Sequence, residues 1–148
     1  MKRFEFRLQR VMDARESEKK QRQRALGDAQ RQLGEAELVL KSLETELANN
    51  NTAQKKLTKG TAKISDLQVL DKWKNHLIKQ ISAQSAEVRR HQKAVEKRRE
   101  ELVEISREKK VLERLKEKKQ EEHQKEMMTS QQNFLDEVGA RNQQNHLS

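Results

Sequence analysis

The side chains with the most chemical capacity in this sequence are its histidines and its many carboxylates. The four histidines are His76, His91, His123 and His146. No two of them are three or four residues apart, the spacings that place two ligands on one helical face. The sequence has no cysteine, which excludes disulfides and thiolate metal sites. We therefore expect no metal site and no bound cofactor.

Carboxylates are dense in segments such as EKRREELVEISREKK, residues 96–110. General acid–base catalysis needs two such groups in a water-poor cleft that separates their pKa values. Here lysines and arginines are interspersed with the carboxylates, a pattern typical of a solvated helix surface. The sequence also lacks a glycine-rich phosphate loop and a nucleophile elbow. We predict that the protein is not an enzyme and has no catalytic residues.

Composition limits the elements that could position a site. Hydrophobic residues make up 32% of the 148 residues, charged residues make up 39%, and there is no proline. A close-packed globule needs more apolar side chains, whereas a coiled coil needs only a narrow apolar stripe. A disordered polyampholyte and a coiled coil remain as candidate classes. Since no segment resembles a membrane span or the core of a signal peptide, we expect a cytosolic protein or one peripheral to a membrane.

Heptad periodicity favours the coiled coil. The first stripe consists of Leu26, Ala29, Leu33, Ala36, Leu40, Leu43 and Leu47. The second consists of Leu67, Leu70, Leu77, Ile81, Val88, Val95, Leu102, Ile105, Leu112 and Leu115. Disordered chains do not keep apolar residues in register over such lengths, so the stripes predict two coiled-coil helices. A shorter stripe, made of Phe4, Leu8, Val11 and Met12, opens the chain. Between residues 13 and 24, before the first long stripe begins, there are almost no large apolar side chains.

The segment LTKGTAKIS between the stripes predicts the turn. Gly60 tolerates the positive φ found at many helix ends, and Ser65 with Gln68 resembles a capping box. We predict an all-α fold, an antiparallel coiled-coil hairpin over residues 1–140. Its expected parts are a helix at about 3–57, a turn at about 58–64 and a longer helix at about 66–139, followed by a frayed tail at 141–148.

A short turn makes the two helices antiparallel neighbours, so the numbers of facing residues add up to about 124. Leu43 then faces Ile81, and Ala36 faces Val88. By the same count the N-terminus ends opposite Lys119. We expect the rest of the second helix to have no partner within the chain.

Positive charge is unevenly distributed. Residues 1–24 contain nine basic and four acidic side chains, and residues 89–126 contain fourteen and ten. In an antiparallel hairpin these excesses gather at the end that carries the termini. Three interpretations remain open: an ordinary solvated surface, contact with an acidic protein pore, or contact with nucleic acid. Nucleic-acid binding usually adds stacking aromatics or a groove-reading motif, and neither is present.

A few apolar residues lie off the two stripes near the turn, and Trp73 is the most prominent. Val69, Trp73 and Leu77 are successive i,i+4 neighbours, as are Val39 and Leu43. The antiparallel register can bring both sets onto one flank. Trp73 either covers the hairpin packing or anchors a protein partner.

The two ends of the sequence resemble a known family. The opening MKRFEFRLQRVMDARE resembles the start of the flagellar export protein FliJ family. The segment EKRREELVEISREKKVLERLKEKKQEEHQKE resembles the second helix of that family, and NFLDEVGARN resembles its usual close. The resemblance covers almost the whole chain, and the chain length, the turn position and the absence of cysteine agree with it. The sequence departs from the family in having no tyrosine and few aromatics.

The resemblance implies a soluble, non-enzymatic stalk of the flagellar type III export apparatus. Family members form a hairpin that sits in the pore of the hexameric export ATPase. The implied partners are that ATPase and its regulator, the membrane export-gate protein and export chaperones, with no nucleic acid and with membrane contact only through proteins. The implied location is the cytoplasmic face of the inner membrane at the flagellar base, where the protein serves flagellum assembly and hence motility and chemotaxis.

Two sets of residues are assigned to these partners as expectations. The set for the ATPase ring is Arg7, Arg10, Arg15, Arg107, Lys109, Lys110, Arg114, Lys116 and Lys118. The set for the export gate is Val39, Leu43, Val69, Trp73, Leu77 and Gln80. The alternatives are a basic coiled coil associated with nucleic acid, and the equivalent stalk of a type III secretion injectisome.

Overall fold

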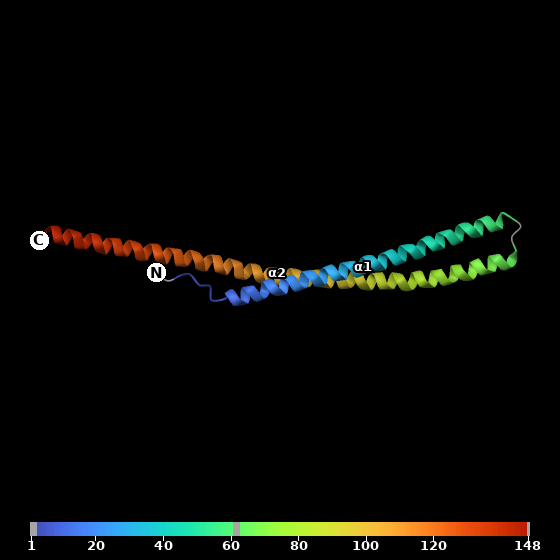
Figure 1. Ribbon diagram of the computed structural model, residues 1–148, viewed down its shortest axis with the longest axis horizontal. Helices are drawn as coiled ribbons and strands as arrows, with labels where there is room; N and C mark the ends of the chain where they lie inside the picture. Colours follow the sequence, from blue (N-terminus) through green and yellow to red (C-terminus); the bar gives the residue numbers. More distant parts are fainter. Residues whose placement is uncertain (1–2, 61–62, 148) are drawn as a thin grey trace. The chain divides into compact units, whose positions relative to one another are not determined.

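In the part of the chain that the structure describes, the protein is all-α and has two helices, as the heptad stripes predict (Figure 1). The computed structural model describes residues 3–60 and 63–147. Helix α1 spans Gln9–Thr58 and helix α2 spans Ile64–Leu147. The second helix is the longer one, and the contacts between the helices are those of an α-helical hairpin.

The helix boundaries differ from the expected ones at three places. Helix α1 begins at Gln9 rather than near residue 3, and residues 3–6 are not helical. Helix α2 begins at Ile64, so Ser65 lies inside it and Lys63 is the capping residue, whose carbonyl oxygen accepts from the Asp66 amide at 3.1 Å. The helix also continues through the expected frayed tail to Leu147, in a segment that has no proline to stop it. Ser148 lies outside the described residues.

The turn between the helices is described only in part. Gly60 donates its backbone amide to the carbonyl oxygen of Leu57 at 3.4 Å. No described glycine has a positive φ, so Gly60 does not use the conformation that the sequence suggested for it. Residues 61 and 62, in the middle of the predicted turn, lie outside the described residues.

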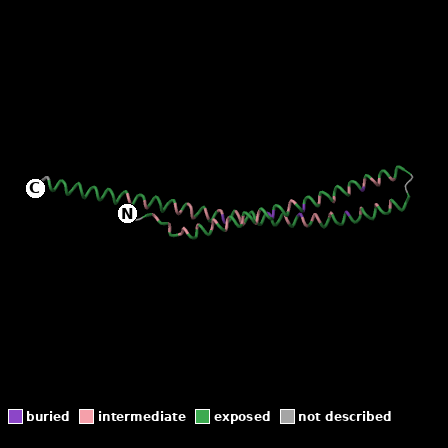
Figure 2. The backbone as a smooth tube through the Cα atoms, in the orientation of Figure 1, coloured by how far each residue is buried: buried purple, intermediate pink, exposed green. Residues whose placement is uncertain are grey.

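The chain divides into two compact units, and residues 20–103 form one of them. Three side chains donate across to backbone carbonyl oxygens of the other helix in this unit: Arg22 to Glu101, Gln84 to Ala36, and Asn50 to Leu70. As the residue number on α1 increases, the number of the bonded residue on α2 decreases, so the two helices are antiparallel. The buried apolar residues of this unit are Ala29, Ala36, Leu77, Val88 and Val95. Figure 2 shows the buried and half-buried stretches along both helices.

The second unit combines residues 1–19 with residues 104–148, of which the structure describes 3–19 and 104–147. Its helices are also antiparallel, because Lys116 Nζ donates to Gln9 Oε1 at 2.8 Å while Arg15 pairs with Glu108 at 3.0 Å. Ile105 is fully buried here. The seam, meaning the positions that face the other helix, therefore follows the predicted register.

Basic side chains occupy the seam where the first stripe lacks large apolar residues. Arg15, Lys19 and Arg22 continue the alternating spacing of three and four residues, and all three are half-buried. Their aliphatic stems can cover apolar neighbours while the charged groups reach the edge of the seam. In each of the two units, half-buried basic residues therefore occupy seam positions where large apolar residues are missing.

Candidate interaction surfaces

Among residues 3–60 and 63–147, no three His, Asp or Glu side chains come together in a group that could hold a metal ion. Within the same part of the chain, no helix combines the length and the apolar character needed to cross a membrane.

The first candidate surface is formed by basic residues of the unit that contains both termini. We call it the basic surface, and its members are Arg7, Arg10, Arg107, Lys110, Arg114 and Lys118. All six are exposed, and none has an ion pair within the described part of the chain. The four members on α2 are spaced by three, four and four residues, so they lie on one helical face. Their charge is therefore available to an acidic partner.

Three other residues expected at the ATPase ring are engaged within the hairpin instead. Arg15 pairs with Glu108 at 3.0 Å, and Lys116 donates to Gln9. Lys109 forms ion pairs with Glu16 on α1 and, at 3.5 Å, with Glu113 on its own helix. These three basic groups therefore have partners within the hairpin, and their expected contact with the ATPase ring stays a prediction.

The pKa of Lys109 departs from its ordinary value. The hydrogen bond to Glu16 raises the pKa of Lys109 above 10.5, partial desolvation opposes this, and the negative charges of Glu16 and Glu113 add to the increase. The charged form of Lys109 is therefore favoured in the folded protein, which suits a role in joining the helices.

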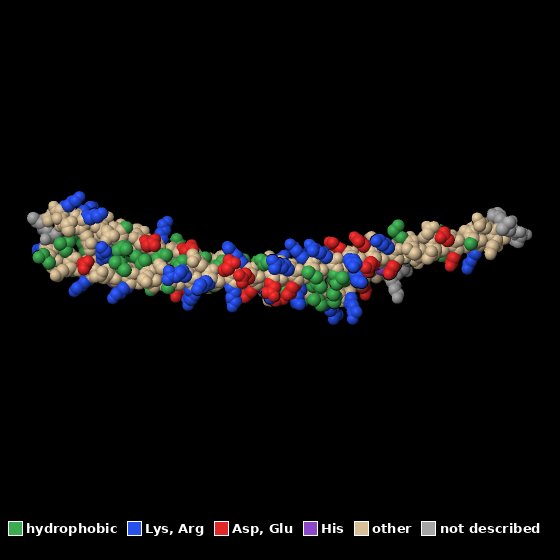
Figure 3. Space-filling model, turned by 180° about the vertical axis from the view of Figure 1, so that it is seen from behind, with side chains coloured by type: hydrophobic (Ala, Val, Ile, Leu, Met, Phe, Trp, Pro, Cys, Tyr) green, Lys and Arg blue, Asp and Glu red, His purple; other side chains and the backbone are tan. Residues whose placement is uncertain are grey.

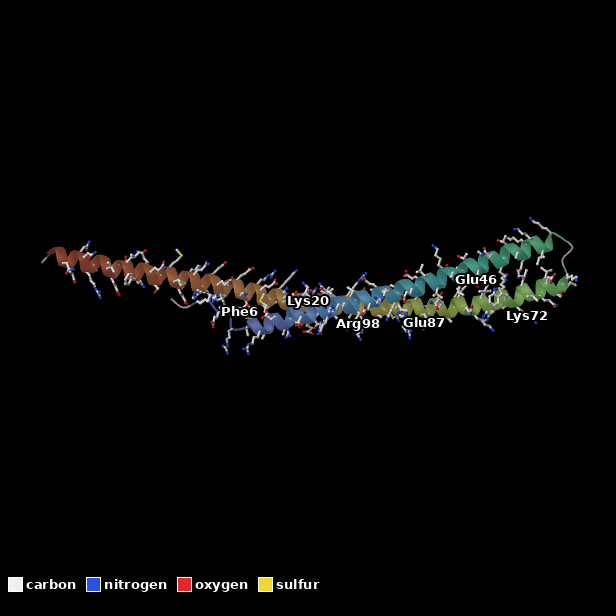
Figure 4. All side chains as sticks on the ribbon, in the orientation of Figure 1. Phe6, Lys20, Glu46, Lys72, Glu87 and Arg98 are labelled. Carbon is white, nitrogen blue, oxygen red and sulfur yellow. The ribbon has the colours of Figure 1, made fainter. Side chains whose placement is uncertain are left out.

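The N-terminal segment forms a feature that the heptad analysis missed. Residues 3–8, which we call the strap, run beside α2, and Phe6 of the strap is labelled in Figure 4. The ring centroid of Phe4 lies 5.6 Å from that of His123. The strap and α2 line a groove of about 1310 Å³, with Phe6, Met127 and Phe134 among its walls. Burial alternates along the strap: Phe4, Phe6 and Leu8 are half-buried and the residues between them are exposed. The alternation of apolar residues in FEFRL is the signal that could have predicted this segment.

The second candidate surface lies near the turn, in the unit of residues 20–103. Val39, Val69, Trp73 and Gln80 are exposed, as their assignment to a partner requires. The side chain of Trp73 is 47% exposed, and its ring centroid lies 5.2 Å from that of His76. Leu43 is half-buried, and Leu77 is fully buried in the core. Leu77 is not accessible to a partner, because its heptad position places it between the two helices.

A groove adjoins this surface. It has a volume of about 510 Å³ and is lined by Ala53, Lys56, Leu57, Asp66, Val69 and Leu70. Val69 lines the groove and stands one helical turn before Trp73. The apolar surface near the turn is therefore continuous with a hollow between the two helices.

The fold and these surfaces define a helical hairpin whose exposed features suit protein contacts. Residues 4–148 match the family described as the flagellar FliJ protein, so the match covers nearly the whole chain. The chain belongs to the flagellar FliJ family, a family of non-catalytic components of flagellar protein export. Neither a search of curated proteins nor a search of solved structures found a match to it. The family that the terminal sequences suggested is thereby confirmed.

Proposed function

We propose that the protein is a stalk that links the hexameric export ATPase to the membrane export gate. The basic surface would contact the ATPase ring, and the exposed apolar residues near the turn would contact the gate. The observation that carries the first contact is that six exposed basic side chains have no acidic partner in the described chain. Carboxylates on a pore wall would supply the missing counter-charges.

The hairpin suits this role mechanically. Two helices packed along a seam are stiffer than one, while a charged flank lets the stalk be held without a large apolar interface. Exposed ion pairs contribute only about 0–1 kcal/mol each, so several must act together. Contacts with the ATPase regulator and with export chaperones, and a location at the cytoplasmic face of the flagellar base, follow from the same proposal. The match to a flagellar family favours the flagellum over an injectisome.

The test is ATP turnover by the purified export ATPase with and without this protein. One variant carries Arg7→Gln, Arg10→Gln, Arg114→Gln and Lys118→Gln. A matched control loses four charges at exposed positions outside both candidate surfaces, which we call the control positions: Arg89, Lys93, Lys97 and Arg99. The first variant should fold normally and lose stimulation, while the control keeps it. Equal stimulation by both variants would remove the basic surface from the ring contact.

A further inference from the structure

Lysines are concentrated around the turn, a region that lies outside the two basic segments 1–24 and 89–126. The seven of them are Lys55, Lys56, Lys59, Lys63, Lys72, Lys74 and Lys79, and we call them the turn lysines. Between residues 55 and 79 only Asp66 and Asp71 oppose them, so this stretch carries a net charge of +5. The hairpin brings the two helical ends together, and lysine and arginine side chains stand out around the turn end, at the left of Figure 3.

The turn lysines have no counter-charge of their own. Elsewhere in the unit of residues 20–103, basic groups pair with acids on the same helix, as Arg90 does with Glu87 at 2.6 Å and Arg98 with Glu101 at 3.0 Å. No turn lysine forms an ion pair with any described residue. All but Lys74 are exposed, and Lys72 is labelled on α2 in Figure 4. A positive field therefore surrounds this end of the hairpin.

Exposed apolar side chains lie among these lysines. Ile64 is 75% exposed at the first residue of α2, Val69 is 66% exposed, and Trp73 stands between Lys72 and Lys74. Lysines next to exposed tryptophan and aliphatic residues suit the boundary between headgroups and acyl chains of a bilayer. There the indole ring is favoured, and the lysine ammonium groups reach the phosphates.

We propose that the turn end of the hairpin binds directly to anionic phospholipid at a membrane surface. A polybasic segment gains attraction with each lysine that lies within a Debye length of such a surface. The choice of lysine over arginine favours lipid as the partner over a folded acidic protein or a nucleic acid. The stretch 55–79 has seven lysines and no arginine. Arginine suits fixed bidentate pairing, whereas the flexible point charge of lysine suits a fluid layer of headgroups.

This inference goes beyond the proposed function, which assigns membrane contact to the gate protein alone. Lipid binding and gate binding are separable, because vesicles without protein can support only the first. A protein that fails to bind such vesicles could still bind the gate. The test therefore uses the full chain and lipid alone.

The probe is a set of vesicles made of phosphatidylcholine, either pure or with roughly one-third phosphatidylglycerol. Flotation measures binding, and Trp73 reports the site because it is the single tryptophan of the chain. We expect binding to the anionic vesicles only, weakened by salt, with a blue shift of Trp73 emission and quenching by brominated lipid. Absence of binding to anionic vesicles would overturn the proposal, as would binding that leaves the emission of Trp73 unchanged.

Two variants of equal charge locate the contact. One carries Lys55→Gln, Lys56→Gln, Lys59→Gln and Lys63→Gln, and the other carries Gln at the four control positions. Circular dichroism verifies that both keep their helicity. The turn variant should bind at least about tenfold more weakly than the native chain, while the control should stay within about twofold of it. Equal losses in both variants would mean that only net charge matters, and would refute the assignment to the turn.

Discussion

Asn50 on α1 donates its side-chain amide to the carbonyl oxygen of Leu70 on α2 at 3.0 Å. Its side chain occupies a seam position and is only 5% exposed. Gln84 makes the same kind of bond to Ala36, also at 3.0 Å. Both donors reach one particular carbonyl oxygen of the opposite helix, so each bond is made in one register only. The Oδ1 atom of Asn50 is buried and accepts no hydrogen bond within the described chain, which is an energetic cost.

This geometry predicts that Asn50 lowers the stability of the hairpin but favours a single register of the two helices. Asn50→Leu should raise the melting temperature, because it removes a buried acceptor and adds apolar packing. It should also weaken the preference for a single register and a single oligomeric state. Circular dichroism would follow melting, and light scattering after size-exclusion chromatography would follow mass. Asn49→Leu, at the exposed neighbouring position, is the control and should change neither. A less stable Asn50→Leu variant would contradict this account of the orphaned oxygen.

Burial of the seam predicts which apolar residues stabilise the hairpin. Ile105 is 0% exposed, so Ile105→Ala should lower the free energy of unfolding by about 2–4 kcal/mol through lost burial and a residual cavity. Val111 is exposed on the same helix, and Val111→Ala should change the free energy by no more than about 0.5 kcal/mol. Urea unfolding followed by circular dichroism measures both. Equal costs at the two positions would show that the seam is misplaced on α2.

Much of the fold could be predicted because a coiled coil encodes its packing in one dimension. Heptad spacing identified both helices, and the turn position fixed which residues face each other. Val88 and Ala36, paired by that count, are both buried in the unit of residues 20–103. The same spacing placed Leu77 in the second stripe. Leu77 is fully buried, so its stripe position predicted its environment better than its closeness to the exposed Trp73.

The remaining features depend on interactions that heptad spacing does not encode. Charge alone suggests that Arg15 and Lys109 contact a partner. In the structure both lie at the seam, where Arg15 forms an ion pair with Glu108 and Lys109 forms one with Glu16. The strap was expected to be helical, because Phe4, Leu8, Val11 and Met12 have the spacing of one face of a helix. A helix would separate Phe4 from Phe6 by about 200° around its axis, whereas the observed segment half-buries both.

The pair between Lys109 and Glu16 predicts a pH dependence at the alkaline end. The pKa of Lys109 is raised above 10.5 in the folded state, chiefly by its hydrogen bond to Glu16. A raised pKa means that the stabilisation is complete below pH 10.5 and is lost as the pH rises through the folded-state value. Melting temperatures measured between about pH 9 and pH 12 would follow this loss.

Glu16→Gln removes the charge that the lysine needs. This variant should be less stable than the native chain at neutral pH, and the difference should shrink as Lys109 deprotonates. Glu117→Gln is the control, because Glu117 is exposed and has no ion pair within the described residues. If the difference between Glu16→Gln and the native chain stayed constant through the alkaline range, the ion pair would not be its source.

Trp73 provides the sharpest test of the gate contact. Its side chain is 47% exposed near the turn, beside the exposed Val69 and the fully buried Leu77. Partly exposed tryptophans that become buried in a complex are common hot spots, with losses of about 2 kcal/mol or more on truncation. Trp73→Ala should therefore weaken binding to the purified cytoplasmic part of the gate protein by about thirtyfold. The melting temperature should change little, because the ring is not part of the core.

Ile78 offers a matched control for this substitution. It is 46% exposed and follows Leu77 directly, whereas Trp73 precedes Leu77 by one helical turn, so the two side chains flank opposite sides of the seam. Ile78→Ala should leave gate binding within about twofold of the native value. Isothermal titration with both variants and with the native chain makes the comparison. If Trp73→Ala lowered the melting temperature strongly, the ring would belong to the hairpin packing, and equal affinities for the two variants would place the gate contact on another surface.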